Sequence, residues 1–270
     1  MGESMAGLFQ VLWGEKGGGF KKAATLNGTD KEPLIIPIKD KSEMTENICT
    51  RPTAVDWDGD GKLDLVVGNF AGTFYVFMGE GKGKFKPKPE PLMTRDGSRL
   101  QVKGHHGDPF MVDWDGDGDL DMVSGSSEGG VQWAQNTGSK GKTPVLKDFE
   151  PLIEPGRKIE WGELISEEEL TEPGNSTRVW VDDVTGDGKL DILVGDNVAL
   201  TSLAKGVTKE EYTEKFAKWQ KALTAASEAM SKLTGDDERE ARKRYSELFQ
   251  QRSEFMKEDR TGYVWLYRRK

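Results

Sequence analysis

The chain has 270 residues, a formal net charge of −9 at pH 7, and nearly as many charged residues (31%) as hydrophobic ones (35%). No apolar run approaches the roughly 18 residues that a membrane helix needs, and the acidic balance disfavours nucleic acid and anionic membranes as partners. We therefore expect neither a membrane span nor a nucleic-acid partner. The single cysteine, Cys49, excludes an internal disulfide framework.

The first predicted element is a strand-and-turn pattern near the N-terminus. It reads AGLFQVLWGEKGGGFKKAATL from Ala6, and it matches AGTFYVFMGEGKGKFKPKPEPL from Ala71, including the Gly-rich turn and the Phe after it. The alternating, aromatic-rich runs predict strands. The Gly-rich runs resemble phosphate-binding loops only superficially, and their repetition at the same place favours hairpin turns.

Three acidic segments then align without gaps. They read AVDWDGDGKLDLVVG at 54–68, MVDWDGDGDLDMVSG at 111–125 and VDDVTGDGKLDILVG at 181–195. With its neighbours, each unit reads as strand, acidic loop, strand, strand, Gly-rich turn and strand, which describes a propeller blade. We therefore predict an all-β fold, a partial β-propeller of about three to four blades of four-stranded antiparallel sheet.

The repeat spacing also predicts the domain boundaries. Residues 146–176 form a long, acidic, Pro-punctuated connection that departs from the repeat. The blades are expected in residues 1–207, with a partial blade at 1–28, blades at about 49–103 and 104–175, and a last blade from 176. Because both ends of the chain cut a blade, we expect the remainder of the propeller in a longer chain.

Residues 208–258 predict an α-helical hairpin inserted into the last blade. Thr208 and Glu211 have the spacing of a capping box. Apolar residues then recur three or four positions apart in two stripes, which a Gly-Asp pair separates, and the second stripe runs to Met256. Residues 259–270 are expected to form the closing strand of the last blade.

The acidic loops have the donor set of a calcium site. In the first loop, Asp56, Asp58, Asp60 and Asp64 stand at positions 1, 3, 5 and 9. Carboxylates this close raise each other's pKa unless a cation lies between them. Calcium takes about 6–8 oxygen ligands in flexible geometry, which suits four carboxylates, the backbone carbonyl of Lys62 at position 7, and water.

Other metals and motifs fit these loops less well. Magnesium prefers few protein ligands in a rigid octahedron, and zinc is disfavoured because the loops contain no His or Cys. An EF-hand needs a bidentate Glu at position 12, where the loops have Val67, Ser124 and Val194. A solvated acidic turn is the remaining alternative, which three copies in register disfavour. At position 8, Leu63 is expected to point away from the ion and anchor the loop in the core.

The loops are expected to differ in affinity, giving two strong Ca²⁺ sites and one weaker site. The second loop is richest in acids, and Asp119 at position 7 would offer its carbonyl. In the third loop Thr185 replaces the acid at position 3, which lowers the charge of the site. The predicted metal ligands are Asp56, Asp58, Asp60, Lys62, Asp64, Asp113, Asp115, Asp117, Asp119, Asp121, Asp183, Thr185, Asp187, Lys189 and Asp191.

These loops resemble the FG-GAP or VCBS-type repeats of integrin-like β-propellers, whose blades carry D-x-D-x-D-G-x-x-D calcium loops. The first two loops match that pattern fully and the third matches with one substitution. The resemblance covers most of residues 1–207 and 259–270, but not the helical hairpin. It implies an extracellular, periplasmic or cell-surface protein that binds a protein or glycan, although the first residues carry no secretion signal.

We expect a binding module and not an enzyme. The alternative is a carbohydrate-active enzyme, a polysaccharide lyase or hydrolase, since similar propellers occur in such lyases and a fold does not choose between these functions. The candidate ligand-binding residues are His105, His106 and Asp108, just before a blade's first strand, although such a pair is usually a solvated turn. Arg51 and Arg178 occupy the places equivalent to Asp108 and could also serve ligand binding.

Overall fold

The structure, a computed structural model, describes residues 7–270 apart from the side chains of Lys41 and Ser42. The first six residues of the predicted partial blade at 1–28 lie outside the described residues. The chain forms two compact units. We call them the blade unit (residues 1–157, 172–197 and 263–270) and the hairpin unit (residues 158–171 and 198–262).

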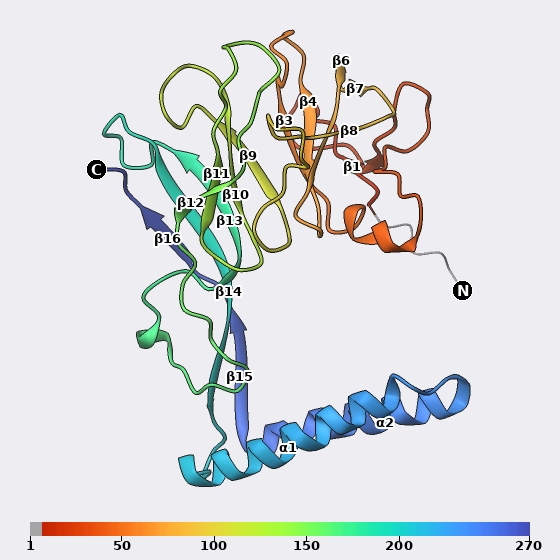
Figure 1. The fold of residues 1–270 in the computed structure, drawn as a ribbon, viewed down its shortest axis with the longest axis vertical. Helices are drawn as coiled ribbons and strands as arrows, with labels where there is room; N and C mark the ends of the chain where they lie inside the picture. Colours follow the sequence, from red (N-terminus) through yellow and green to blue (C-terminus); the bar gives the residue numbers. More distant parts are fainter. Residues whose placement is uncertain (1–6) are drawn as a thin grey trace. The chain divides into compact units, whose positions relative to one another are not determined.

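The blade unit is built from antiparallel sheets, and the prediction of a mostly β, propeller-like chain with four-stranded sheets and two helices is confirmed (Figure 1). The first sheet contains β3 (Arg51–Val55), β4 (Asp64–Gly68), β5 (Phe74–Phe77) and β8 (Glu90–Pro91). The second contains β9 (Asp108–Val112), β10 (Asp121–Gly125), β11 (Val131–Ala134) and β12 (Glu150–Ile153). The third contains β13 (Asn175–Asp182), β14 (Asp191–Leu203) and β16 (Val264–Tyr267).

Two small hairpins complete the strands of the blade unit. They are β1 (Gln10–Val11) with β2 (Ala24–Thr25), and β6 (Gly79–Gly81) with β7 (Lys84–Phe85). Both hairpins close the Gly-rich turns that the sequence predicts. The predicted connection at 146–176 contains a strand that the sequence analysis missed, since β12 pairs with β11 there.

The first and second strands pair in the same register in all three sheets, so each residue of one sheet has an equivalent in the other two. Arg51 pairs with Gly68, Asp108 pairs with Gly125, and Arg178 pairs with Gly195. Strand β9 packs against both β3 and β13, so the first strands of successive blades are neighbours. One core lies between the first and second sheets and includes Val66, Phe74 and Met122, and a second lies between the second and third sheets and includes Val123, Val131 and Val194.

Glycines allow this close approach of neighbouring blades. A Cβ at Gly68 would lie 2.2 Å from the carbonyl oxygen of Gly107, and a Cβ at Gly125 would lie 2.2 Å from that of Thr177. These distances are far below van der Waals contact, so only glycine fits at the end of the second strand. The equivalent Gly195 has no atom within 4 Å of its Cβ direction.

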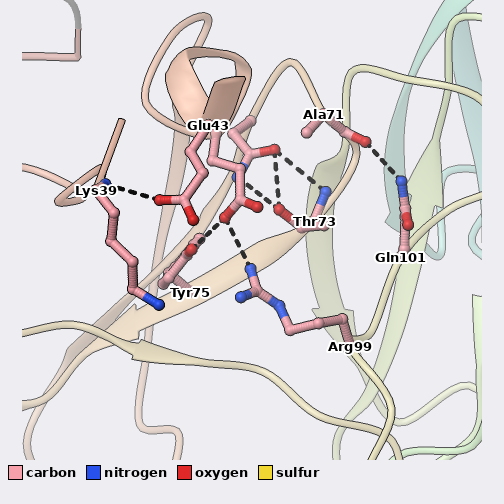
Figure 2. A network of polar contacts seen from close by, with 9 residues as sticks. Lys39, Glu43, Ala71, Thr73, Tyr75, Arg99 and Gln101 are labelled. Atoms are coloured by element: carbon pink, nitrogen blue, oxygen red, sulfur yellow. Dashed lines mark hydrogen bonds and ion pairs between the residues drawn. The ribbon is translucent and has the colours of Figure 1, made fainter. Parts of the chain in front are cut away.

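The N-terminal segment is bound to the first blade by polar contacts that Figure 2 shows. A 3-10 helix, Lys41–Glu46, carries Glu46, whose carboxylate accepts hydrogen bonds from the Tyr75 hydroxyl and, at 3.0 Å, from Arg99. The Arg99 guanidinium also lies over the Tyr75 ring at 4.7 Å. Beneath these contacts, Phe9, Leu34 and Ile36 pack against Phe77 and its neighbours in the first sheet.

The hairpin unit contains two helices, α1 (Lys209–Met230) and α2 (Gly235–Gln251), followed by β15 (Met256–Thr261). Thr208 and Glu211 form the expected capping box, with bonds of 3.2 and 3.0 Å. The core of the unit consists of Tyr212, Trp219, Leu223, Phe255 and Met256, with Phe216, Tyr245, Leu248 and Phe249 packed against it. Among the described residues, neither helix has the length and apolarity of a membrane-crossing segment.

The predicted helical region at 208–258 extends too far. Residues 256–261 instead form β15, which pairs with the second half of β14, from Val198 to Leu203. The apolar spacing misled here because Met256 belongs to the same hydrophobic core as the helices while its backbone is extended. Strand β16, at 264–267, pairs with the first half of β14 within the blade unit.

We predict that Gly125→Ala destabilises the blade unit by about 1–3 kcal/mol, because the new methyl group overlaps the Thr177 carbonyl and forces the packed strands apart. The matched control is Gly195→Ala, at the same position of the third repeat, where the methyl group meets open space. Urea unfolding monitored by tryptophan fluorescence measures both. Equal stability of the two variants would contradict this role of the glycine.

Candidate metal sites

The acidic loops join the first and second strands of each sheet, which fixes where their carboxylates lie. In the first loop, Gly59 and Gly61 have φ angles of +74° and +83°, a region that other residues adopt rarely. Glycines at the same positions of the other two loops also have positive φ. The backbone therefore curls tightly at each loop.

Two of the three loops bring carboxylates together closely enough to share a cation. Oxygen atoms of Asp56, Asp58 and Asp64 lie within 4.8 Å of one another, and so do those of the group in the second loop, Asp113, Asp115 and Asp117. Among the residues that the structure describes, the third loop forms no comparable group. The two groups differ in their third member. In the first loop it is the acid at position 9, Asp64, and in the second loop it is the acid at position 5, Asp117.

The position-9 aspartates have a second role that the sequence analysis did not predict. Asp64 is 1% exposed and accepts hydrogen bonds from Trp57 N at 2.8 Å and Gly79 N at 2.5 Å. Asp121 is equally buried and accepts from Trp114 N at 3.0 Å and Asn136 N at 2.6 Å. Each carboxylate thus joins its own loop to the residue two positions after the end of the third strand of the same sheet.

Burial raises the pKa of Asp64 and of Asp121, although the backbone hydrogen bonds lower it in part. Nearby carboxylates act in the same direction as burial: Asp58 and Asp60 raise the pKa of Asp64, and Asp115 raises that of Asp121. The protein alone therefore does not balance the negative charge at these two loops. A bound cation would reverse this effect, because it favours the charged carboxylates.

In the first loop a lysine competes with a cation. The Lys62 ammonium forms an ion pair with Asp60, and this hydrogen bond lowers the pKa of Asp60. Between positions 1 and 9 the loop has four aspartates and one lysine, a formal charge of −3. Asp60 must give up its ion pair with Lys62 to serve as a ligand. The first loop therefore attracts a cation less strongly than the second loop.

The second loop has five aspartates and no basic residue between positions 1 and 9, a formal charge of −5. At position 7 it carries Asp119, which is 8% exposed and whose Oδ1 is buried without a hydrogen-bond partner. Burial, and then the charges of Asp117, Asp121 and Asp115, raise the pKa of Asp119. In the first loop, Asp56 also has a buried Oδ1 without a hydrogen-bond partner.

The third loop is arranged differently. The Thr185 hydroxyl donates to Asp191 Oδ2 at 2.9 Å, so the position-3 residue is bound to the position-9 acid. Burial would raise the pKa of Asp191, but hydrogen bonds from Thr185 and Arg269 outweigh it and lower the pKa. The loop has three aspartates and Lys189, a formal charge of −2, and its acids are already satisfied by protein donors.

Arg269 joins the third loop to the second. Its backbone N–H donates to Asp191 Oδ1 at 3.3 Å, and its guanidinium donates to the carbonyl oxygen of Trp114 at 2.7 Å. The guanidinium also lies 4.6 Å from the centre of the Trp114 ring. One residue therefore contacts the backbone of one loop and the position-9 carboxylate of the next.

The expectation that Leu63 anchors the first loop in the core is wrong, since Leu63 is 59% exposed. The anchors are the tryptophans at position 2, Trp57 at 4% and Trp114 at 9% exposure. In the third loop the equivalent Val184 is 45% exposed, so this loop lacks a buried anchor. A tryptophan repeated in two copies of one motif was the signal in the sequence that could have identified these positions.

The candidate ligand-binding residues lie near one another at the start of the first strands. Asp108 accepts from Arg178 at 3.3 Å, and Arg51 donates to the His106 carbonyl oxygen at 3.0 Å. Burial raises the pKa of Asp108, and burial with the neighbouring arginines lowers that of His106. His105 stacks on Phe70 with ring centres 5.6 Å apart. The role of His105, His106 and Asp108 in ligand binding stays a prediction.

The donor set and its unsatisfied atoms fit a hard cation in the first two loops. Carboxylate oxygens are the ligands that calcium and magnesium prefer. Two of them, Asp56 Oδ1 and Asp119 Oδ1, are buried without a hydrogen-bond partner among the described residues. Such an atom costs free energy unless a donor or a cation satisfies it. We conclude that these acidic clusters could bind a metal ion.

The loops and the strands beside them also match a known repeat family. The model of the FG-GAP-like repeat matches residues 56–103 and 113–194, which include all three acidic loops. The chain carries FG-GAP-like repeats. With the sheets described above, these repeats form a propeller-type module, and the FG-GAP part of the predicted resemblance is confirmed.

Among solved structures, the repeat chain is similar to one described as an Agrocybe aegerita lectin that specifically recognises non-reducing terminal N-acetylglucosamine. The two are 18% identical, with a TM-score of 0.34. The match covers 69% of this chain and 42% of that lectin, so the repeat chain spans less than half of its length. No curated protein sequence gives a significant match.

We predict that Asp121→Asn and Asp117→Asn separate the two roles of the loop carboxylates. In EDTA, Asp121→Asn should lower the free energy of unfolding by about 1–3 kcal/mol. Each oxygen of the Asp121 carboxylate accepts one backbone N–H, whereas the amide of Asn has a single acceptor oxygen, so one buried N–H loses its acceptor. Asp117→Asn changes an exposed side chain and should match the wild type in EDTA. With metal present, Asp117→Asn should lose most of the stabilisation that metal at the second loop gives. Identical behaviour of the variants in both buffers would refute the division of roles.

Proposed function

We propose that this FG-GAP-like chain is a calcium-stabilised propeller module that recognises an extracellular protein or glycan. The observation that carries the proposal is the grouping of three carboxylates within 4.8 Å in each of the first two loops, together with the unpartnered oxygens of Asp56 and Asp119. In this proposal the metal is structural, and the surfaces around the loops serve recognition.

Calcium is the cation that the donor set favours. The first loop would use Asp56, Asp58, Asp60 and Asp64 with the carbonyl of Lys62, and the second loop the equivalent acids and the carbonyl of Asp119. So many carboxylates in one small loop suit the larger, more flexible coordination of calcium and not the rigid octahedron of magnesium. Bound calcium would order the loop between the first two strands of each sheet.

An extracellular location would suit this role for calcium. Extracellular modules commonly bind calcium with dissociation constants of about 10⁻⁴–10⁻³ M, which the calcium outside cells satisfies. We expect the first and second loops, because of their negative charge, to bind calcium with dissociation constants in this range. A secreted or cell-surface location, periplasmic included, is therefore part of the proposal.

Recognition, and not catalysis, is the activity that we propose. Asp108 accepts from Arg178, burial and the neighbouring Arg51 lower the pKa of His106, and the Nδ1 atom of His106 has no hydrogen-bond partner among the described residues, so the two side chains do not form a hydrogen-bonded acid–base pair. A screen of glycans and surface proteins with the calcium-loaded protein would test recognition directly. Degradation of an acidic polysaccharide by the wild type, lost in a His105→Ala/His106→Ala double variant, would instead establish an enzyme.

We predict that calcium raises the stability of the blade unit. A ligand that binds only the native state stabilises it by about 2.7 kcal/mol at a free concentration of 100 times its dissociation constant. Differential scanning calorimetry should therefore show a higher Tm in millimolar calcium than in EDTA, and restored calcium should reverse the loss. An unchanged Tm across a calcium titration would overturn the structural role.

We predict that the affinities of the loops follow their charge, with the second loop tightest and the third weakest. Thr185→Asp should raise the affinity of the third loop, because it restores the acid at position 3 and frees Asp191 from the Thr185 hydroxyl. Lys62→Gln should raise the affinity of the first loop, because the ion pair with Asp60 is removed. Isothermal titration calorimetry measures each step, with Lys84→Gln on β7 as a control for general charge. An unchanged third site in Thr185→Asp would contradict this order.

A further inference from the structure

A basic cavity lies in the hairpin unit, at the end where β14 leads toward α1 and where α2 returns into β15. Its volume is about 430 Å³. The residues that carry its chemistry are Lys205, Arg252, Ser253 and Lys257. None of them belongs to the acidic loops or to the FG-GAP-like match, which ends at residue 194.

The charge of this cavity is positive in a chain whose net charge is −9. Lys205 is exposed and makes no ion pair among the described residues. Lys257 pairs with Asp259 at 2.6 Å. The one carboxylate in the lining, Glu258, is occupied elsewhere, since it pairs with Arg260 at 3.3 Å and accepts from Trp161 Nε1 at 3.2 Å. An anion in the cavity would therefore meet cations without displacing Glu258 from its partners.

Arg252 supplies the directional donors. Its guanidinium lies 3.7 Å from the centre of the Phe249 ring, which fixes the plane of the side chain. Its Nη1 is enclosed and donates to no acceptor among the described residues. A buried donor without an acceptor is unfavourable, and an anion bound beside Arg252 would offset this cost by accepting from the guanidinium. Ser253 lies on the same wall of the cavity, where its hydroxyl donates to the Gln250 carbonyl oxygen at 2.9 Å.

We propose that this cavity binds the tetrahedral oxyanion of a sulfate or phosphate ester. Two ammonium groups and a planar guanidinium can satisfy three or more oxygens at once, which suits a dianion with several acceptors better than a single carboxylate. The volume exceeds that of the oxyanion alone and accommodates part of the group that bears it. The hairpin insertion thus carries a ligand site of its own, independent of calcium in the blade unit.

The test is calorimetric titration of the full chain at constant ionic strength, with glucose 6-sulfate and glucose 6-phosphate as separate probes. Glucose is the neutral control, and glucuronate is the carboxylate control. We expect at least one ester to bind and glucose not to bind. Lys205→Gln and Arg252→Gln should each weaken binding by about tenfold or more, the loss expected for one charge-assisted hydrogen bond. Which ester binds identifies sulfate or phosphate as the source of the anion.

Matched variants separate a built site from general electrostatics. Lys221→Gln and Arg239→Gln remove exposed basic residues from the same helical hairpin and should leave binding unchanged. Because Arg252 packs on Phe249, the variant at that position is checked by circular dichroism, and Lys205→Gln tests the site without a buried change. The proposal fails if neither ester binds, if glucuronate binds as tightly, or if the control variants weaken binding as much as Lys205→Gln.

Discussion

A buried carboxylate that accepts two backbone hydrogen bonds is the interaction on which each blade depends. A buried charge is tolerated only where donors or cations compensate it. Asp64 and Asp121 meet this requirement from two sides, with one N–H group from their own loop and one from the residue two positions after the third strand. The loop, the inner hairpin and the third strand are thereby joined at one point. The remaining carboxylates crowd on the open side of the loop, and this is where a cation could bind.

The distance between neighbouring blades is set at the other end of the same hairpin, where the second strand ends. Glycine ends the second strand, so the backbone of the next blade lies against it, as the Gly107 carbonyl does at Gly68. The first strands of successive blades become neighbours, and the charged residues that begin them are brought into one row. A single repeated motif therefore fixes both the metal loop at one end of the hairpin and the contact between blades at the other.

The repeats made the sheets, the two helices and the acidic loops predictable from the sequence. Aligned copies identify strands that a single copy leaves ambiguous, and the capping box at Thr208 located the start of α1. Strand β12 was missed because prolines and acids obscure its alternation. The end of α2 was misplaced because Met256 continues the helical spacing of apolar residues although its backbone is extended.

Within the site, the residue types were predictable and their partners were not. The fifteen predicted ligands come from one pattern, but the pattern does not show that Thr185 binds Asp191 or that Leu63 points outward. Those outcomes depend on residues from other strands. The basic cavity is beyond sequence reasoning altogether, since Lys205 and Arg252 are brought together only by the fold of the hairpin unit.

The contacts of Arg269 have a consequence for how the second and third loops respond to ligands. The backbone N–H of Arg269 donates to Asp191 in the third loop, and its side chain donates to Trp114 in the second loop. A shift of either loop therefore moves one acceptor of Arg269 and changes the contact of Arg269 with the other loop. If binding at the second loop changes the affinity of the third loop by some factor, binding at the third loop changes the affinity of the second by the same factor. Cation binding at the second loop would therefore be coupled to the third loop through Arg269, whereas no arginine among the described residues makes such contacts with the first loop.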